Sequence, residues 1–151
     1  MEINVINSDH KKESIVFDSI KDYIPEFEGI EFKHLEDKKA AIFDFEGYKN
    51  LELVIRVDVK CKEILADKYN DYVISKEKAW LANSDPDRDY FVIFYFKDYW
   101  CRVFDLHKCD LKLEDFTFVH KRTKELMTQK VYKIPARGFA YEFWCEIYFG
   151  S

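Results

Sequence analysis

Hydrophobic positions near the N-terminus of the chain recur at the spacing of an amphipathic helix. Ser8 or Asp9 is a suitable N-cap for this helix, and Pro25 marks its end because proline cannot continue a helical hydrogen-bond ladder. The apolar positions that follow the 3.6-residue period are Ile15, Val16, Ile20, Tyr23, Ile24 and Phe27. The pattern predicts a first helix that ends near Pro25.

The pattern then changes to that of β-strands. Apolar and polar residues alternate over residues 30–35, and a second apolar segment, residues 40–45, is interrupted only by Asp44. Residues 46–50 are of turn-forming types, and residues 51–60 are rich in β-branched side chains. Strand, turn and strand in this order predict a β-hairpin that carries Asp44 on one strand.

A second helix is predicted from Ser75, which is a favourable N-cap residue. Its small and aromatic side chains, Ala79, Trp80 and Ala82, are expected to face inward, and residues 83–87 end it with turn-forming types.

The following segment, residues 90–96, has no polar alternation, which is typical of a strand covered on both faces. Residues 97–99 are expected to turn the chain into another strand, residues 100–106. A short charged segment, residues 121–129, separates these from aromatic strand-like pieces near the C-terminus. The order of helix, strands, helix and strands predicts an α/β (α+β) fold with a central mixed sheet flanked by helices.

Size and composition agree with a globular protein. The chain has 151 residues, 48% of them hydrophobic and 18% aromatic, with only four Gly and three Pro. One domain, residues 1–151, is expected, because two separate cores would each be small. The start of the chain lacks the charge and hydrophobic pattern of a signal peptide, and no apolar stretch is long enough for a membrane helix, so an intracellular, cytoplasmic protein that is not exported is expected.

The predicted hairpin also carries candidate chemistry. Side chains two apart on a strand lie on one face, about 6.6–6.8 Å apart, so Asp58 and Lys60 should emerge together while Val59 faces the other way. If the partner strand brings Asp44 beside Asp58, the two carboxylates and the carbonyl of Val59 provide the oxygen ligands that Mg²⁺, or Mn²⁺, prefers. Lys60 would then lie where it can orient or deprotonate a water, or neutralise charge on a phosphoryl group.

The context of Asp58-Val59-Lys60 distinguishes it from other acid-x-Lys triplets. Six such triplets occur, beginning at Asp9, Glu31, Glu36, Asp37, Asp58 and Asp110. Only Asp58 combines the end of a long apolar strand, a preceding turn, and an acid in the preceding apolar segment. Two alternatives stay open: Asp58 and Lys60 form a solvated strand face paired with Arg56 or Glu52, or a register shifted by two residues puts Glu46 in the place of Asp44.

The predicted hairpin resembles the motif of the PD-(D/E)XK nuclease superfamily, the restriction-endonuclease-like and Holliday-resolvase-like enzymes. The resemblance is carried by residues 42–45, the turn, and residues 53–60. The similarity extends over about residues 8–107. It implies a restriction-endonuclease-like core in which Asp44, Asp58 and Lys60 are catalytic, Asp44, Asp58 and the Val59 carbonyl bind metal, and an acid on the first helix, Glu13, assists. The sequence departs from the family in having Phe43 where proline is usual and Asp58 where glutamate is commoner.

Basic residues cluster late in a chain whose net charge is −5. The cluster consists of Lys121, Arg122, Lys124, Lys130, Lys133 and Arg137, and Lys or Arg on one surface favours contacts with a nucleic-acid backbone. Other polar and aromatic residues that follow Lys60 closely, Tyr69, Tyr72, Ser75, Lys76 and Lys78, are candidates for the lining of the same cleft.

These features predict a metal-dependent endonuclease that hydrolyses phosphodiester bonds, with DNA as the expected partner and no membrane partner. A homodimer that cuts two strands and a monomer that nicks one both stay open. The alternative is a non-catalytic nucleic-acid-binding or protein-interaction module of the same fold. The four cysteines form no CxxC pair, and reduced, mostly buried thiols are expected.

Overall fold

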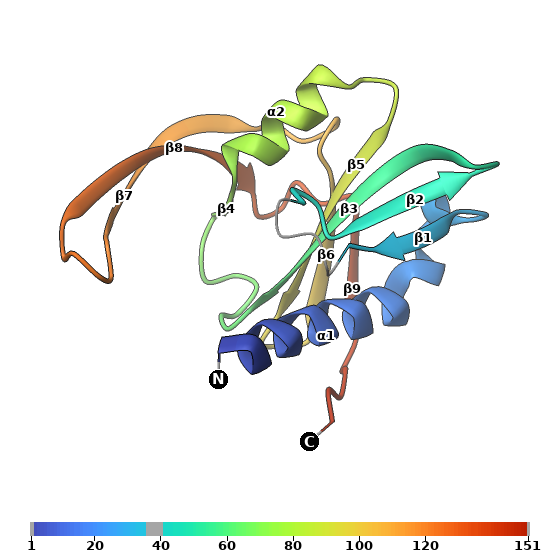
Figure 1. Ribbon diagram of the computed structural model, residues 1–151, viewed down its shortest axis with the longest axis horizontal. Helices are drawn as coiled ribbons and strands as arrows, with labels where there is room; N and C mark the ends of the chain where they lie inside the picture. The colour runs from blue at the N-terminus through green and yellow to red at the C-terminus, as the bar shows by residue number, and fades with distance from the viewer. Residues whose placement is uncertain (1, 36–40, 151) are drawn as a thin grey trace.

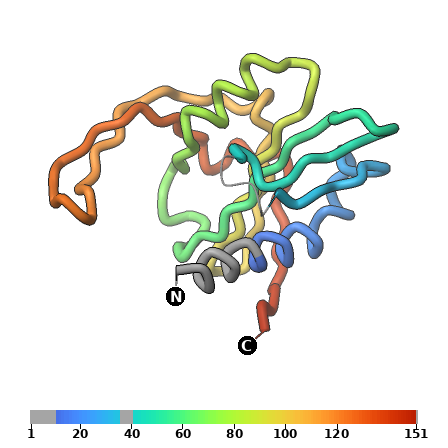
Figure 2. Tube along the Cα trace, viewed as in Figure 1, coloured from blue at the N-terminus to red at the C-terminus, as the bar shows by residue number. Residues whose placement is uncertain are grey.

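A computed structural model describes the backbone of residues 2–35 and 41–150, and the side chains of residues 11–35 and 41–150 (Figures 1 and 2). A six-stranded sheet forms its centre, with one helix on each face, and a three-stranded sheet extends to one side. The expectation of a mixed sheet flanked by helices is confirmed.

The first helix, α1, spans Glu2–Ile20 and is followed by two short 3₁₀ helices, Lys21–Tyr23 and Pro25–Phe27. The predicted start at Ser8 or Asp9 is wrong, because both residues lie inside α1. The predicted end near Pro25 is also too late, since α1 ends at Ile20 and a 3₁₀ helix covers Lys21–Tyr23. Ile24, before Pro25, is extended (φ −103°, ψ 110°), which is the backbone that proline imposes on its predecessor. Tyr23 does not share the buried face, since it is 67% exposed.

Strands β1 (Glu31–His34), β2 (Phe45–Lys49) and β3 (Glu52–Lys62) form an antiparallel meander. Strand β5 (Asp89–Phe96) then pairs with β3 in parallel, and β6 (Trp100–Asp105) and β9 (Tyr141–Trp144) complete the sheet. The spatial order is β1-β2-β3-β5-β6-β9. The hairpin predicted from the sequence is therefore β2-β3, and the strand predicted at residues 90–96 lies inside the sheet.

The hairpin turn lies later in the chain than predicted. The turn consists of Asn50 and Leu51, whose φ angles of 52° and 67° are those of a tight two-residue hairpin turn. The predicted strand 40–45 and turn 46–50 are therefore wrong in their bounds: residues 41–44 are not strand, residues 46–49 belong to β2, and Asp44 lies just before that strand in a bend. Gly47 is typical of a turn by residue type, but it lies within β2. A Cβ there would lie 2.4 Å from Cγ2 of Ile55, so glycine permits close packing within the sheet. Residue 40, part of the predicted strand 40–45, lies outside the described residues.

Strand β5 contributes to two separate cores, one on each face of the sheet. Phe91 and Ile93 pack with buried residues of α1 on one face, whereas Val92 and Phe94 pack with residues of α2 and β6 on the other. Because successive side chains of a strand point to opposite faces, a strand covered on both sides needs apolar residues at every position. This explains the uninterrupted apolar segment in the sequence.

Helix α2 spans Lys76–Ser84 and lies on the face opposite to α1 (Figure 1). The predicted cap is confirmed, since Oγ of Ser75 accepts a hydrogen bond from the backbone N–H of Lys78 at 3.3 Å. Ala79 and Ala82 are buried as predicted. Trp80 is not, because it is 64% exposed.

The second sheet consists of β4 (Asp71–Ile74), β8 (Leu126–Pro135) and β7 (Lys112–Val119), in the order β4-β8-β7. Strands β7 and β8 form a long hairpin that projects from the body of the molecule, here called the β7–β8 arm (Figures 1 and 2). The charged segment of residues 121–129 is divided between the tip of this arm and the start of β8.

The buried side chain of Arg102 joins the two sheets. It donates hydrogen bonds to Glu142 on β9, to Asp67, to the hydroxyl of Tyr72 on β4, and to the carbonyls of Ala66 and Ala136. A charged side chain that is 2% exposed is tolerated because its donors are paired. Arg102 therefore fixes the base of the arm against β6.

The four cysteines are free thiols, and Cys101 is buried. No helix within residues 2–35 and 41–150 is long and apolar enough to cross a membrane.

Candidate metal and phosphodiester site

The end of β3 presents charged groups on one face and apolar groups on the other, as the alternation predicted. Val57 and Val59 are fully buried in the core that contains α1. Asp58 and Lys60 point to the opposite face, and the whole Asp58 residue is only 1% exposed. A buried carboxylate therefore lies at the centre of the sheet rather than on a solvated strand face.

Asp44 reaches the same strand from outside β2. Its Oδ2 accepts a hydrogen bond from the backbone N–H of Val59 at 2.9 Å, and its carbonyl accepts one from the N–H of Leu35 at 2.7 Å. Strand β2 begins at Phe45, which pairs with Val57, so the side chain of Asp44, just before the strand, takes the place of the next ladder partner. Within a strand, the N–H and C=O of one residue point to the same side, so the carbonyl of Val59 also faces the side of Asp44.

The surroundings of Asp58 disfavour its charge. Burial and the nearby charge of Asp44 raise the pKa of Asp58 from 3.8 to about 7, although Lys60 and Lys78 oppose the shift. Oδ2 of Asp58 is buried and accepts no hydrogen bond from any described residue. Two carboxylates that repel each other in a buried place are the arrangement that a divalent cation would relieve.

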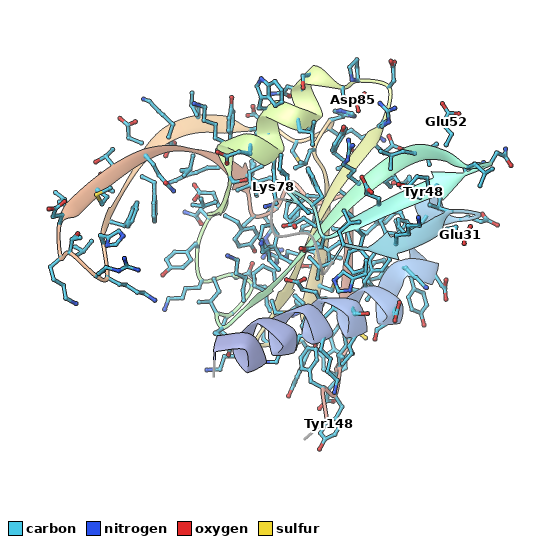
Figure 3. All side chains as sticks on the ribbon, in the orientation of Figure 1. Glu31, Tyr48, Glu52, Lys78, Asp85 and Tyr148 are labelled. Atoms are coloured by element: carbon cyan, nitrogen blue, oxygen red, sulfur yellow. The ribbon has the colours of Figure 1, made fainter. Side chains whose placement is uncertain are left out.

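Two ammonium groups approach Asp58 from different elements. Nζ of Lys60 lies 3.6 Å from Oδ2 of Asp58, and Nζ of Lys78, in the first turn of α2, lies 3.5 Å from the same oxygen. Burial lowers the pKa of Lys60, but Asp58, Asp44 and Glu13 raise it by more, so the net direction is upward. Lys60 is therefore held in its charged form. In Figure 3, Lys78 is labelled on α2, on the side of the helix nearest the sheet.

The other predicted acid also contributes to this region. Glu13 on α1 lies 3.8 Å (Oε2) from Nε2 of His34, the last residue of β1, and its charge helps to raise the pKa of Lys60. The ring of His34 stacks on Phe45 with a centroid separation of 4.4 Å. His34 was not predicted from the sequence, and Lys78 was predicted only as a candidate for the lining of the cleft.

The oxygen atoms grouped at the end of β3 are of the types that bind a divalent cation. Asp44, Asp58 and the Val59 carbonyl lie together, which matches the ligand types that Mg²⁺ and Mn²⁺ take. Among the described residues, no group of three or more His, Cys, Asp or Glu side chains is arranged to hold a metal. A cation here would accordingly need the backbone carbonyl and water to complete its shell.

The alternative pairings considered from the sequence do not form around Asp58. Arg56 lies 3.6 Å (Nε) from Oε2 of Glu46 and donates a hydrogen bond to the hydroxyl of Tyr90 at 2.8 Å. Glu46 is opposite Arg56 in the β2-β3 ladder and also accepts from Tyr48, so it takes no part in the group around Asp58.

The six predicted nucleic-acid-binding residues do not form one free basic strip. Lys121, Arg122 and Lys124 lie in the tip of the β7–β8 arm, between the two strands. Lys130 pairs with Asp115 at 2.7 Å. Two further pairs neutralise the rest of the cluster: Lys133 with Glu114 at 3.1 Å and Arg137 with Asp67 at 2.9 Å. The acidic partners come from distant segments, so the sequence window did not reveal them.

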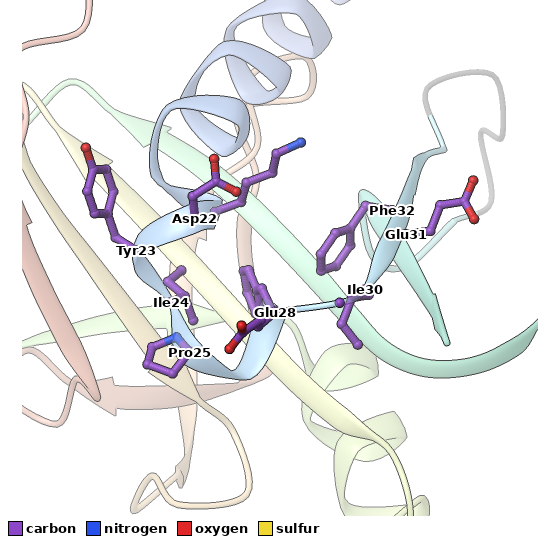
Figure 4. Close-up of a pocket in the computed structure, with 11 residues that line it drawn as sticks. Asp22, Tyr23, Ile24, Pro25, Glu28, Ile30, Glu31 and Phe32 are labelled. Atoms are coloured by element: carbon purple, nitrogen blue, oxygen red, sulfur yellow. The ribbon is translucent and has the colours of Figure 1, made fainter. Parts of the chain in front are cut away.

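A wide hollow beside β1 is separate from these groups. Figure 4 shows its lining, which includes Asp22, Tyr23, Pro25, Glu28 and Glu31 around the two 3₁₀ helices. The lining of this hollow includes none of Asp44, Asp58 and Lys60. The charged group at the end of β3 is therefore the better candidate for chemistry.

Comparison with known proteins finds similarity among solved structures. No protein-family model matches the sequence, and no curated protein does. Among solved structures, the chain is similar to Hjc, a Holliday junction resolvase from the archaeal hyperthermophile Archaeoglobus fulgidus. The identity is 11% and the TM-score 0.46, over 84% of this chain and 86% of that chain. At this distance the similarity assigns no role to any residue, and the roles must rest on geometry.

Proposed function

We propose that the chain is a metal-dependent nuclease that hydrolyses phosphodiester bonds, with DNA as the expected substrate. One observation carries the proposal: two carboxylates and a lysine from separated segments meet at the end of β3. Asp44 is bound to the N–H of Val59 at 2.9 Å, and Lys60 lies 3.6 Å from Asp58. These are the residues through which the sequence resembles the PD-(D/E)XK nucleases.

The carboxylates of Asp44 and Asp58 and the carbonyl of Val59 would hold Mg²⁺ or Mn²⁺. When bound, such an ion polarises a phosphoryl oxygen and lowers the pKa of a water. Glu13 would add negative charge from α1, which helps to keep Lys60 protonated.

Lys60 would act as a cation rather than as a base. Its pKa is raised, so at neutral pH it donates hydrogen bonds and cannot accept a proton. A protonated lysine beside the metal site orients the attacking water and stabilises the negative charge that develops on the phosphoryl group.

A second candidate is a non-catalytic nucleic-acid-binding module of the same fold. The observation in its favour is that Asp58 has two lysine neighbours, at 3.5 and 3.6 Å, which balance its charge without a metal ion. In that case the charged group is structural, and the arm provides the contacts with the nucleic acid.

A cleavage assay separates the two candidates. Single-stranded, double-stranded and branched DNA, and RNA, are incubated with the protein in Mg²⁺, in Mn²⁺ or in EDTA. We expect cleavage only with metal, and a loss of about a hundredfold or more in Lys60→Ala and Asp58→Ala, because each removes a group that acts on transition-state charge. Lys49→Ala, an exposed lysine beside the hairpin turn, is the control and should cleave as wild type does.

Metal binding provides a readout without substrate. Calorimetric titration with Mn²⁺ should give a site in the wild type that Asp58→Asn lacks. Absence of metal-dependent cleavage on every substrate, or equal cleavage by Lys60→Ala, contradicts the nuclease and leaves the binding module.

A further inference from the structure

A second hollow, of about 490 Å³, begins where β3 ends and extends to the base of the β7–β8 arm. Its volume lies in the range of small-ligand sites. It is lined by three aromatic rings and three charged groups: Tyr69, Tyr72, Phe116, Lys62, Lys133 and Asp71. The nuclease proposal uses none of these residues.

The aromatic rings that line this hollow differ in exposure: one is buried and two are accessible. Tyr72 is 4% exposed, and its hydroxyl is bound to the carbonyl of Ala66 and to Arg102, so its ring is held in place. Tyr69 is 54% exposed and Phe116 is 38% exposed. Exposed aromatic rings that line one hollow can stack on a nucleic-acid base, whatever its sequence.

The positive charge in the hollow is concentrated at its β3 end. No described carboxylate lies within ion-pair distance of Lys62, whereas Lys133 is held by Glu114 at 3.1 Å and lies 3.9 Å from Asp71. Lys62 also lies near Lys60 and Lys78, whose charges combine with burial to lower its pKa. An anion beside Lys62 would relieve this crowding of like charges.

The hollow follows directly from the proposed cleavage site. Lys60 and Lys62 are two residues apart on β3 and share a face, so their side chains leave the strand about 6.6–6.8 Å apart. A phosphate at Lys60 and the next phosphate at Lys62 would place the intervening base toward Tyr69 and Phe116.

We infer that this hollow binds one unpaired nucleotide adjacent to the scissile phosphate, with its base stacked on Tyr69 and Phe116 and its phosphate on Lys62. A base inside a duplex is stacked and paired, and its faces are not available to protein rings. The substrate is therefore single-stranded, or unpaired, on this side of the cut. The position of the cut rests on the proposed function, but the binding of the nucleotide does not.

The test measures binding in EDTA, where no cleavage occurs. A fluorescent thymidine oligonucleotide and a blunt duplex of the same length are titrated with protein, and anisotropy gives Kd. We expect tighter binding of the single strand. Tyr69→Ala and Phe116→Ala should each weaken it by about fivefold to a hundredfold, which is the effect of one base–aromatic stack. Lys62→Gln should weaken it and reduce its dependence on salt.

Matched variants exclude unfolding as the cause. Tyr148→Ala removes an aromatic side chain that is 87% exposed near the C-terminus, away from the arm (Figure 3), and should bind as wild type does. Tyr69→Phe and Phe116→Trp keep a ring and should restore binding.

The two proposals fail separately. Unchanged single-strand binding in Tyr69→Ala and Phe116→Ala, a duplex bound as tightly as the single strand, or no binding of either overturns the nucleotide site. Ring-dependent binding of the single strand supports it even if the wild type cleaves nothing, a result that would overturn only the nuclease.

Discussion

Replacement of Asp58 by asparagine should stabilise the folded chain at pH 8 in the absence of divalent metal. Asparagine has nearly the shape of aspartate but carries no charge. The carboxylate of Asp58 is 2% exposed and faces Asp44, so the substitution removes a charge that the fold disfavours. The proposed metal site would be lost at the same time.

The magnitude follows from the pKa of Asp58, which is 3.8 as a reference and about 7 in the folded chain. Each unit corresponds to about 1.36 kcal/mol, so ionised Asp58 destabilises the fold by up to about 4 kcal/mol. The folded state binds the proton more tightly than the unfolded state does. Stability from this group is therefore complete below about pH 4, and falls as the pH rises toward 7. Because the amide of asparagine places N–H donors near Lys60 and Lys78, a gain of about 2–4 kcal/mol is expected.

Urea unfolding in EDTA between pH 5 and pH 8 measures this effect. The free-energy difference between Asp58→Asn and wild type should grow with pH and level off above about 7, which isolates Asp58 from other titrating groups. Asp115→Asn, whose exposed carboxylate pairs with Lys130, is the control and should change stability by less than about 0.5 kcal/mol at every pH. A variant less stable than wild type at pH 8, or a difference that is independent of pH, would refute the reasoning.

Two further predictions concern the fold. Gly47→Ala should destabilise the chain by about 1–3 kcal/mol in urea unfolding, because its Cβ has no room between β1 and β3, whereas Gly138→Ala, whose nearest atom would be 3.3 Å away, should cost clearly less. Equal costs would show that the packing at position 47 yields. Arg102→Leu should cost about 3–5 kcal/mol by the same measurement, since it leaves the carboxylate of Glu142 and several buried acceptors without their donor. The control is Arg122→Leu, in the exposed tip of the arm, which should change stability little. If Arg102→Leu is as stable as Arg122→Leu, the structural role of Arg102 is contradicted.

The parts of the site that lie on one strand could be predicted from the sequence. A strand has a side-chain period of two, so the opposite directions of Asp58 and Val59 follow from their positions alone. The segment from residue 90 to 96 was equally informative, because only a strand covered on both faces is apolar throughout. The order of the elements then followed from the alternation of helix and strand patterns.

The contacts between distant segments could not be predicted in this way. Lys78 reaches Asp58 because α2 packs over the sheet, and no local pattern specifies which turn of a helix faces a given strand residue. The ion pairs within the basic cluster could not be predicted for the same reason, since Asp67 and Glu114 pair with Arg137 and Lys133 from separate segments. Asp44 was identified correctly as a neighbour of β3, although the prediction placed it on a strand and the structure places it in a bend.

The charged face of β3 connects the two proposals. Asp58, Lys60 and Lys62 follow one another at intervals of two residues, so one face of a single strand carries a carboxylate and then two ammonium groups. The pKa of Asp58 is raised and that of Lys62 is lowered, and in both cases burial is the largest cause and a like charge adds to it. A metal ion beside Asp58 and a phosphate beside Lys62 would each relieve one of these costs. A nucleic-acid strand that binds with its metal would therefore relieve both, and metal and single-stranded DNA should each increase the affinity of the chain for the other.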